Sequence, residues 1–188
     1  IYLIILIVCS YFIETVIYFV KKDKETISRT DLYKKISLEK TNVALTIHSS
    51  YFFKKNIDTF PLSGKSNSTT IFCDENLYHS IYNSDRYGFN NPDYFWDEEN
   101  VDAIVLGDSF ALGACENPPQ DMISMIRTFS NKKIINLGNS GNGPIMEYAS
   151  YKEYADKKNF QKIIWMFNEE NDIENLSKEK TNPILLNY

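Results

Sequence analysis

Residues 102–110, Asp-Ala-Ile-Val-Leu-Gly-Asp-Ser-Phe, bring a serine onto a turn, where its hydroxyl can act as a nucleophile. The apolar run predicts a short buried strand that breaks at Gly107. Such a turn holds Asp108 and Ser109 at the carboxyl edge of a sheet, where open α/β folds bind their ligands. Taken alone, Gly-Asp-Ser is more typical of an ordinary strand-to-loop turn. The functional interpretation therefore depends on what else reaches this edge.

Two further segments repeat the pattern of an apolar strand followed by a polar turn. The run 133–138 leads into Asn-Ser-Gly-Asn-Gly-Pro at 139–144, and the run 162–167 leads into Asn-Glu-Glu-Asn-Asp at 168–172. The intervening residues predict crossover helices over roughly 121–129 and 145–157, with Pro144 opening the second helix. Strands that alternate with helices in this way predict a parallel sheet covered on both faces, with all three polar turns at one edge.

The three turns together resemble a known family. Gly107-Asp108-Ser109, Ser140-Gly141-Asn142 and Asn171-Asp172, in this order and each after a strand, are similar to the first three sequence blocks of the SGNH (GDSL-type) hydrolases. The segments 87–92 and 139–144 resemble the flanking residues of membrane-anchored bacterial members, and the resemblance covers roughly residues 85–188. It implies a three-layer α/β/α, flavodoxin-like fold, and hydrolysis or transfer of acyl esters, often on carbohydrates or lipids.

The resemblance also implies roles for single residues. Ser109 matches the nucleophile, while the N–H of Ser109, the N–H of Gly141 and the side-chain amide of Asn171 match the donors of the oxyanion hole. Preorganised donors suit acyl transfer because negative charge develops on the carbonyl oxygen in the transition state. A glycine lets the backbone approach a substrate closely, and an asparagine amide donates without adding charge. Considered singly, Gly141 reads as a turn glycine and Asn171 as a helix N-cap.

The sequence departs from the family pattern in two places. Glu169-Glu170 stands where a glycine usually precedes the Asn-Asp pair, and no Asp-x-x-His segment follows to supply the general base. The two histidines, His48 and His79, precede Ser109, and we interpret both as surface or packing residues. Carboxylates such as Asp172 and Glu169 are weak proton acceptors from a hydroxyl when their pKa is near its usual value of about 4.

The missing block predicts that these residues are a fragment of a longer protein. The sequence begins at Ile1, without Met, inside a hydrophobic run, and it ends at Tyr188, where a full SGNH domain would need more sheet and helix. We expect the native protein to be a serine esterase or O-acyltransferase. Without a base, the 188 residues alone are expected to be inactive.

The amino-terminal residues 1–20 are almost entirely apolar, with Glu14 as the single charge, and lysines follow at once. Twenty helical residues reach about 30 Å, the thickness of a bilayer core, so a single-pass transmembrane anchor is predicted. Basic residues after the span favour a cytoplasmic body, whereas similarity to anchored envelope enzymes favours an extracytoplasmic one, which we prefer. Cys73 and Cys115 are one available pair, but free buried thiols are the favoured interpretation.

The remaining segments set the predicted organisation. A charged juxtamembrane linker is expected over residues 21–40, a β-prone accessory segment over 41–100, and the N-terminal part of the SGNH hydrolase domain over 101–188. The net charge of −5 and the lack of a basic stripe argue against a nucleic-acid partner. No cluster has metal-ligand spacing, and no cofactor is expected. The predicted partners are the membrane and an acyl-ester substrate, on a glycan or a lipid.

Two other functions compete with the enzyme. Gly138, Gly141 and Gly143 follow a strand and open a helix as a phosphate-binding loop does, but their spacing reverses the dinucleotide fingerprint and no Lys-Ser/Thr follows. The second alternative is a non-catalytic, membrane-tethered SGNH-like binding or scaffolding protein that has lost its base. An Asp-x-x-His segment further along the polypeptide would separate the enzyme from the scaffold.

Overall fold

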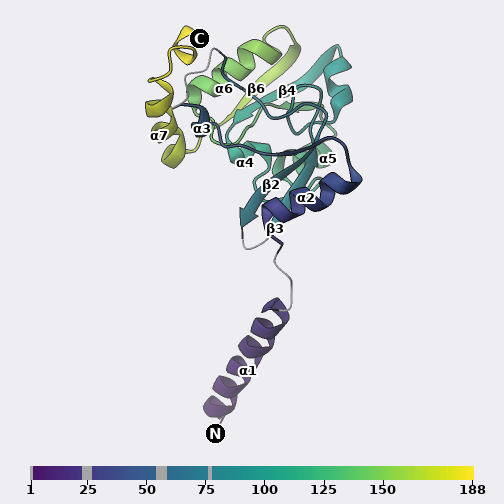
Figure 1. Cartoon of the computed structure of the whole chain (residues 1–188), viewed down its shortest axis with the longest axis vertical. Coiled ribbons are helices and arrows are strands. Elements are labelled where there is room, and N and C mark those ends of the chain that lie inside the picture. The colour runs from purple at the N-terminus through teal and green to yellow at the C-terminus, as the bar shows by residue number, and fades with distance from the viewer. Residues whose placement is uncertain (1, 23–26, 54–58, 76–77) are drawn as a thin grey trace.

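The computed structural model of the chain describes residues 2–22, 27–53, 59–75 and 78–188, without the side chains of residues 3–5, 18–22, 74 and 75. Helices and strands alternate over most of the length (Figure 1). The α-helices are α1 Tyr2–Lys22, α2 Arg29–Glu39, α3 Ser50–Phe53, α4 Ser109–Leu112, α5 Met122–Ser130, α6 Pro144–Ser150 and α7 Glu169–Glu179. The strands are β1 Val43–Leu45, β2 Thr69–Glu75, β3 Tyr78–Asn83, β4 Asn100–Gly107, β5 Ile134–Asn136 and β6 Asn159–Met166. Short 3₁₀ or π turns occupy Asp93–Asp97, Tyr151–Ala155 and Leu185–Asn187.

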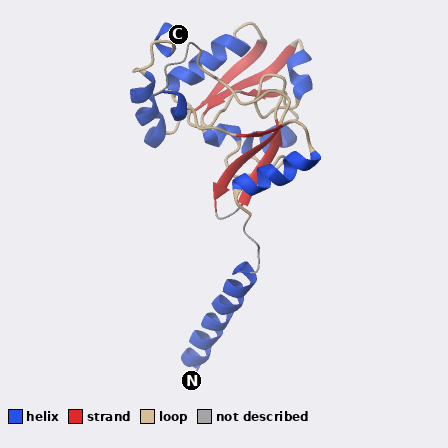
Figure 2. Ribbon diagram, viewed as in Figure 1, coloured by secondary structure: helices blue, strands red, loops and turns tan. Residues whose placement is uncertain are grey.

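The sheet that carries the three polar turns is parallel, as predicted. Its described strands have the order β5-β4-β6, and β4 pairs in parallel with both neighbours. Figure 2 shows this sheet with helices packed around it. Because all three strands run the same way, the residues that follow Gly107, Asn136 and Met166 lie at one edge. The mixed α/β class is therefore confirmed.

Side chains 103–106 of β4 alternate between two apolar clusters on opposite faces of the sheet. Ala103 and Val105 pack with Ala111 of α4 and Ile123 of α5. On the opposite face Ile104 and Leu106 belong to a second cluster, whose other members are Phe89, Phe95, Trp96, Val101, Ile135, Leu137 and Ala155. Burial on both faces explains why β4 reads as a continuous apolar run.

Strand β6 differs from the expectation that helices cover both faces along the whole sheet. It is one of the two edge strands of the described sheet, and most of its side chains are exposed, with Ile163 at 43% and Trp165 at 54%. The helix that follows it, α7, packs on α6 rather than over β6. Apolar side chains on both sides of β6 therefore lie open to solvent.

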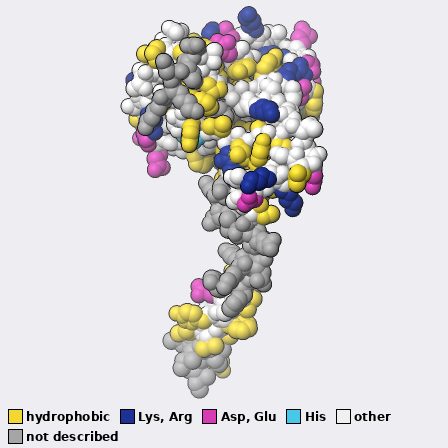
Figure 3. Space-filling view, viewed as in Figure 1, with side chains coloured by type: hydrophobic (Ala, Val, Ile, Leu, Met, Phe, Trp, Pro, Cys, Tyr) yellow, Lys and Arg dark blue, Asp and Glu magenta, His cyan; other side chains and the backbone are white. Residues whose placement is uncertain are grey.

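Helix α1 extends away from the body of the protein (Figure 1), and its described side chains are exposed and mainly hydrophobic (Figure 3). The prediction of a transmembrane anchor over residues 1–20 is not supported: none of the helices, as far as their residues are described, combines the length and apolar character needed to cross a bilayer. Residue 1 and the side chains of residues 3–5 and 18–20 of that segment lie outside the described part.

The segment predicted to be β-prone forms a separate sheet in the order β1-β2-β3, with β1 parallel and β3 antiparallel to β2. Before it, α2 forms where a charged linker was expected, with Ser28 as its N-cap. This accessory sheet packs against α4: Phe72 of β2, Tyr82 of β3 and Leu112 of α4 form one buried cluster.

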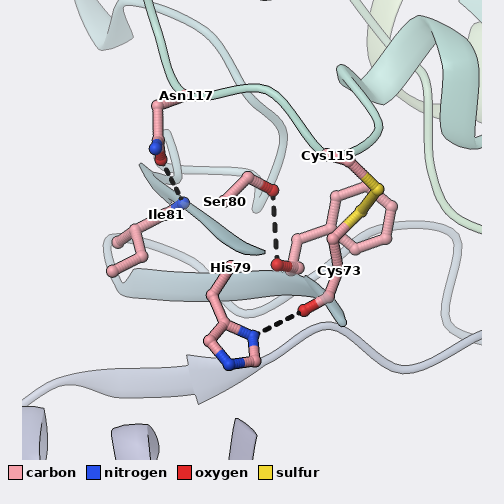
Figure 4. Close-up of a disulfide and its surroundings, with 7 residues drawn as sticks. Cys73, His79, Ser80, Ile81, Cys115 and Asn117 are labelled. Atoms are coloured by element: carbon pink, nitrogen blue, oxygen red, sulfur yellow. Dashed lines mark hydrogen bonds between the residues drawn. A yellow bond between two sulfur atoms is a disulfide. The ribbon is translucent and has the colours of Figure 1, made fainter. Parts of the chain in front are cut away.

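A disulfide ties the same two parts together. Cys73 of β2 bonds to Cys115, three residues after α4 ends (Figure 4). Nearby, Asn117 accepts a hydrogen bond from the N–H of Ile81 at 2.6 Å. The interpretation of these cysteines as free thiols was wrong, because folding brings their α-carbons to 5.2 Å although they are 42 residues apart.

Candidate active site

Ser109 is the first residue of α4, the short helix that begins as β4 ends. Gly107 allows this abrupt change because a Cβ there would lie only 2.8 Å from the Cβ of Ala111. Asp108 is the N-cap, and its Oδ1 accepts a hydrogen bond from the N–H of Phe110 at 2.9 Å. Ser109 is half-buried, so its hydroxyl lies at the surface of a rigid turn.

Two buried asparagines hold α4 from outside the helix. Asn90 donates to the carbonyl of Leu112 at 3.0 Å, and Asn136 at the end of β5 donates to the carbonyl of Ala111 at 2.6 Å. Asn91 in turn donates to the carbonyl of Asn136 at 2.9 Å. The segment 87–92, which the sequence marked only as flanking residues, therefore supports the turn that carries Ser109.

The polar turn after β5 lies between α4 and α7. On one side, the N–H of Asn139 donates to the carbonyl of Gly107 at 3.3 Å. On the other side, Asn175 of α7 donates to the carbonyl of Asn142 at 3.2 Å, and the carboxylate of Glu179 accepts from the N–H of Gly143 at 2.7 Å. The turn is thus held by hydrogen bonds to the end of β4 on one side and to α7 on the other.

Asn171 lies in the first turn of α7, and its Nδ2 donates to Oδ2 of Asp108 at 2.5 Å. This hydrogen bond brings the third polar turn to the residue next to Ser109. The N-cap of α7 is Asn168, whose side chain accepts from the N–H of Glu170 at 3.1 Å, so Asn171 does not cap the helix. Its amide is engaged by a carboxylate, and its Oδ1 is buried without a hydrogen-bond partner among the described residues.

Gly141 has a φ of 78°, in the left-handed region that favours glycine. The space that its missing Cβ leaves is filled by a side chain of the accessory segment. A Cβ on Gly141 would lie 2.2 Å from Cε1 of His48. The other side of His48 is exposed to solvent. His48 therefore lies at the predicted site, although the sequence, in which it comes 61 residues before Ser109, gave no indication of this.

Buried carboxylates surround the site. Burial raises the pKa of Asp172, whose Oδ2 accepts from the N–H of Asn168 at 2.6 Å. Burial also raises the pKa of Glu147 in α6 to about 8, against a hydrogen bond from Nε1 of Trp165 that lowers it. Asp172 is completely buried, so it is not placed as an open base, whereas Glu169 is exposed. Among the described residues, no group of histidine, cysteine and carboxylate side chains has the arrangement of a metal site.

An apolar groove of about 680 Å³ begins beside the turn that carries Ser109. Its wall starts at Phe110, the residue after Ser109, and continues along the outer side of α5. The exposed apolar residues in it are Phe110, Met122, Met125, Ile126 and Phe129. Such a surface has room for an apolar part of a ligand that reacts at Ser109.

Comparisons of the chain with family models, with curated proteins and with solved structures find no match. The roles of Ser109, Gly141 and Asn171 therefore rest on the sequence blocks and on the site geometry. What the geometry adds is that Asp108 contacts Asn171 directly, while the turn containing Gly141 contacts Gly107 and α7.

Proposed function

We propose that the chain is the nucleophile-bearing part of a serine esterase or O-acyltransferase of the SGNH type. The observation that most supports this proposal is the hydrogen bond from Asn171 to Asp108. It joins the turn after β6 to the turn after β4, beside the loop that contains Gly141. An ester carbonyl bound there would face a hydroxyl, backbone N–H groups and a carboxamide, which is the set of groups that acyl transfer requires.

In the proposed reaction the Oγ of Ser109 attacks the carbonyl carbon of the ester and loses its proton to a general base. The N–H groups of Ser109 and Gly141 and the amide of Asn171 bind the oxyanion of the tetrahedral intermediate. Collapse of the intermediate breaks the ester bond, and the alcohol leaves with the proton from the base. Water or an acceptor hydroxyl then attacks the acyl-enzyme and restores Ser109.

For the base, we rely on the family resemblance, which implies an Asp-x-x-His segment that has no match after Ser109 in this sequence. In this proposal the segment belongs to a longer polypeptide that contains these residues. The acyl donor is an ester with an apolar portion, since the groove that begins at Phe110 adjoins the nucleophile. Acyl esters of glycans and of lipids both meet this description.

The proposal is tested by labelling the full-length gene product with a fluorophosphonate probe and by measuring hydrolysis of p-nitrophenyl acetate. We expect labelling and turnover that Ser109→Ala abolishes, and that the control Ser177→Ala, an exposed serine on α7, leaves unchanged. The 188 residues alone should show neither activity. Turnover by this shorter chain that depends on Ser109 would show that the external base is unnecessary.

The absence of any labelling at Ser109 in the full-length protein would favour the non-catalytic alternative. One observation bears on that alternative: one of the two N–H groups of the Asn171 amide donates to Asp108. In a binding or scaffolding protein the second N–H would not respond when an ester is added, whereas in an enzyme it would donate to the substrate oxygen. The side-chain NH₂ signals of Asn171 in NMR spectra distinguish the two cases.

An extracytoplasmic location for the body is also part of the proposal. The disulfide between Cys73 and Cys115 supports it, because such bonds persist in oxidising compartments. Alkylation of cells before lysis, followed by non-reducing electrophoresis, should show the oxidised form as the main species. The membrane anchor over residues 1–20 stays a prediction.

A further inference from the structure

The backbone on both sides of His48 is fixed to the two parts of the protein that meet at the site. Before it, the N–H of Thr46 donates to the carbonyl of Ile71 in β2 at 3.0 Å. After it, the N–H of Ser49 donates to the carbonyl of Ser140 at 3.0 Å, and the hydroxyl of Ser49 donates to the carbonyl of Gly141. His48 is therefore held over the turn after β5 by neighbours on either side.

The imidazole ring of His48 lies against the α-carbon of Gly141. A Cβ built on Gly141 would be 2.2 Å from Cε1, 2.3 Å from Nδ1 and 2.5 Å from Nε2 of His48. All three distances are far below van der Waals contact, so the ring occupies the place of the missing side chain. The proposed oxyanion donor, the N–H of Gly141, belongs to the residue that the ring touches.

One backbone contact of the ring points to Nδ1 as the nitrogen that accepts a hydrogen bond. Nδ1 of His48 accepts from the backbone N–H of Ser50 at 3.3 Å and lies 2.8 Å from the hydroxyl of Ser50. In a neutral imidazole the other nitrogen then bears the hydrogen, so Nε2–H is a donor. Partial burial and the charge of Lys178 lower the pKa of His48, against the opposing charge of Asp108, which favours this neutral form at pH 7.

We infer that His48 is a substrate-contacting residue of the Ser109 site, which donates Nε2–H to an oxygen of the bound ester. This inference rests on the proposed function and extends it to the accessory segment. His48 does not act as the base, because the nitrogen that would accept a proton is turned to Ser50. A neutral donor beside Gly141 would favour a substrate with an oxygen in that position.

The inference is tested by NMR of the uniformly ¹⁵N-labelled chain with sodium acetate, the carboxylate product of an acetyl ester, as the probe. Long-range ¹H–¹⁵N spectra show the ring nitrogens, and the chain has two histidines, so His79 serves as an internal control. We expect His48 to be the Nε2–H tautomer at pH 7. Acetate should shift the ring signals of His48 together with the amides of Ser109 and Gly141, in one saturable step, and leave His79 unchanged.

Two variants test the contribution of the donor. His48→Phe keeps a ring over Gly141 but removes the hydrogen bond, and should weaken acetate binding about tenfold. His48→Gln keeps a donor near the position of Nε2 and should bind acetate within about threefold of the original. Folding of each variant is checked by its amide spectrum.

The outcomes separate this inference from the proposed function. Acetate shifts at Ser109 and Gly141 with no response at His48, or equal binding by His48→Phe, would overturn the inference and leave the proposed function in place. An Nδ1–H tautomer would overturn it as well. If acetate shifts the amide signals of neither Ser109 nor Gly141, the proposed oxyanion site is wrong, and both the inference on His48 and the proposed function are refuted.

Discussion

Nδ2 of Asn171 donates a hydrogen bond to Oδ2 of Asp108 at 2.5 Å, so the start of α7 is attached to the residue before the proposed nucleophile. The two residues are 63 positions apart in the chain. Because the hydrogen bond joins residues so far apart in the sequence, it constrains the relative position of the ends of β4 and β6 in addition to the strand pairing. Changing either partner should therefore affect both stability and the geometry at Ser109.

Asn171→Asp puts a second carboxylate against Asp108 and should lower the free energy of unfolding by about 2 kcal/mol at pH 8. Repulsion raises the folded-state pKa of the pair above the ordinary value of about 4, so the deficit should be complete above that raised pKa and should shrink as the pH falls from there towards 4. Thermal unfolding at pH 4 and pH 8 measures the effect, with the exposed Asn159→Asp as the control. A deficit that does not depend on pH would contradict the direct contact.

Reduction of the disulfide should destabilise the protein by about 4 kcal/mol, the entropy expected for releasing a loop of this length. The bond joins Cys73 to Cys115 across 42 positions and links the accessory sheet to α4. The free energy of unfolding in guanidinium tests this value. It is measured for the original chain with and without dithiothreitol, and for Cys73→Ser. Cys9 is free and exposed on α1, so Cys9→Ser should behave like the original chain; an equal loss in both variants would refute the structural role of the bond.

Glu147 should make stability fall as the pH rises. Burial raises its pKa from 4.5 to about 8, so the folded protein keeps a proton that the unfolded chain loses between these values. Glu147→Gln has no proton to lose and should be more stable than the original by about 1 to 4 kcal/mol at pH 8.5, and similar at pH 4.5. Urea unfolding at both pH values, with the exposed Glu99→Gln as the matched control, decides the point.

Asp85 should be one of the most sensitive positions in the fold. Its buried carboxylate accepts hydrogen bonds from the N–H groups of Tyr87 and Phe89, from Asn91 and from Nε1 of Trp96. Asp85→Ala leaves these donors without a partner and should cost about 3 to 5 kcal/mol.

The control for this prediction is Asp97→Ala, which removes one exposed ion pair with Arg86 and should cost less than about 1 kcal/mol. Chemical unfolding of the two variants under the same conditions gives both values. Similar losses would mean that the buried donors near Asp85 find other partners.

The parallel sheet could be predicted because its strands are apolar runs: β4 and β5 bury both faces, and β6 carries a similar run although most of its side chains are exposed. The turns after β4 and β5 could also be predicted, because glycine and asparagine are typical turn residues. Helix α7 was not predicted, since the residues on its inner side are polar. Asn175 and Glu179 bind backbone groups of the turn after β5, and Asp172 binds the N–H of the N-cap residue Asn168, instead of packing in an apolar core. A search for apolar periodicity misses a helix of this kind.

The position of His48 and the pairing of Cys73 with Cys115 could not be predicted for a different reason. Both depend on how the accessory sheet docks against α4, a tertiary contact made by Phe72, Tyr82 and Leu112. When two parts of a protein dock and bring single residues together, those residues have no characteristic spacing in the sequence by which the contact could be recognised. The order of three polar turns did leave such a pattern, and the three turns do lie at one edge of the parallel sheet.

The two asparagines that hold α4 limit how Ser109 can move. Asn90 and Asn136 each bind a carbonyl of the helix, so its backbone cannot translate without breaking both hydrogen bonds. Rotation about the Cα–Cβ bond is the freedom that remains to the serine. In the proposed reaction, orientation of the hydroxyl for attack would then need only a side-chain rotation, on the nanosecond scale or faster, and no rearrangement of a loop.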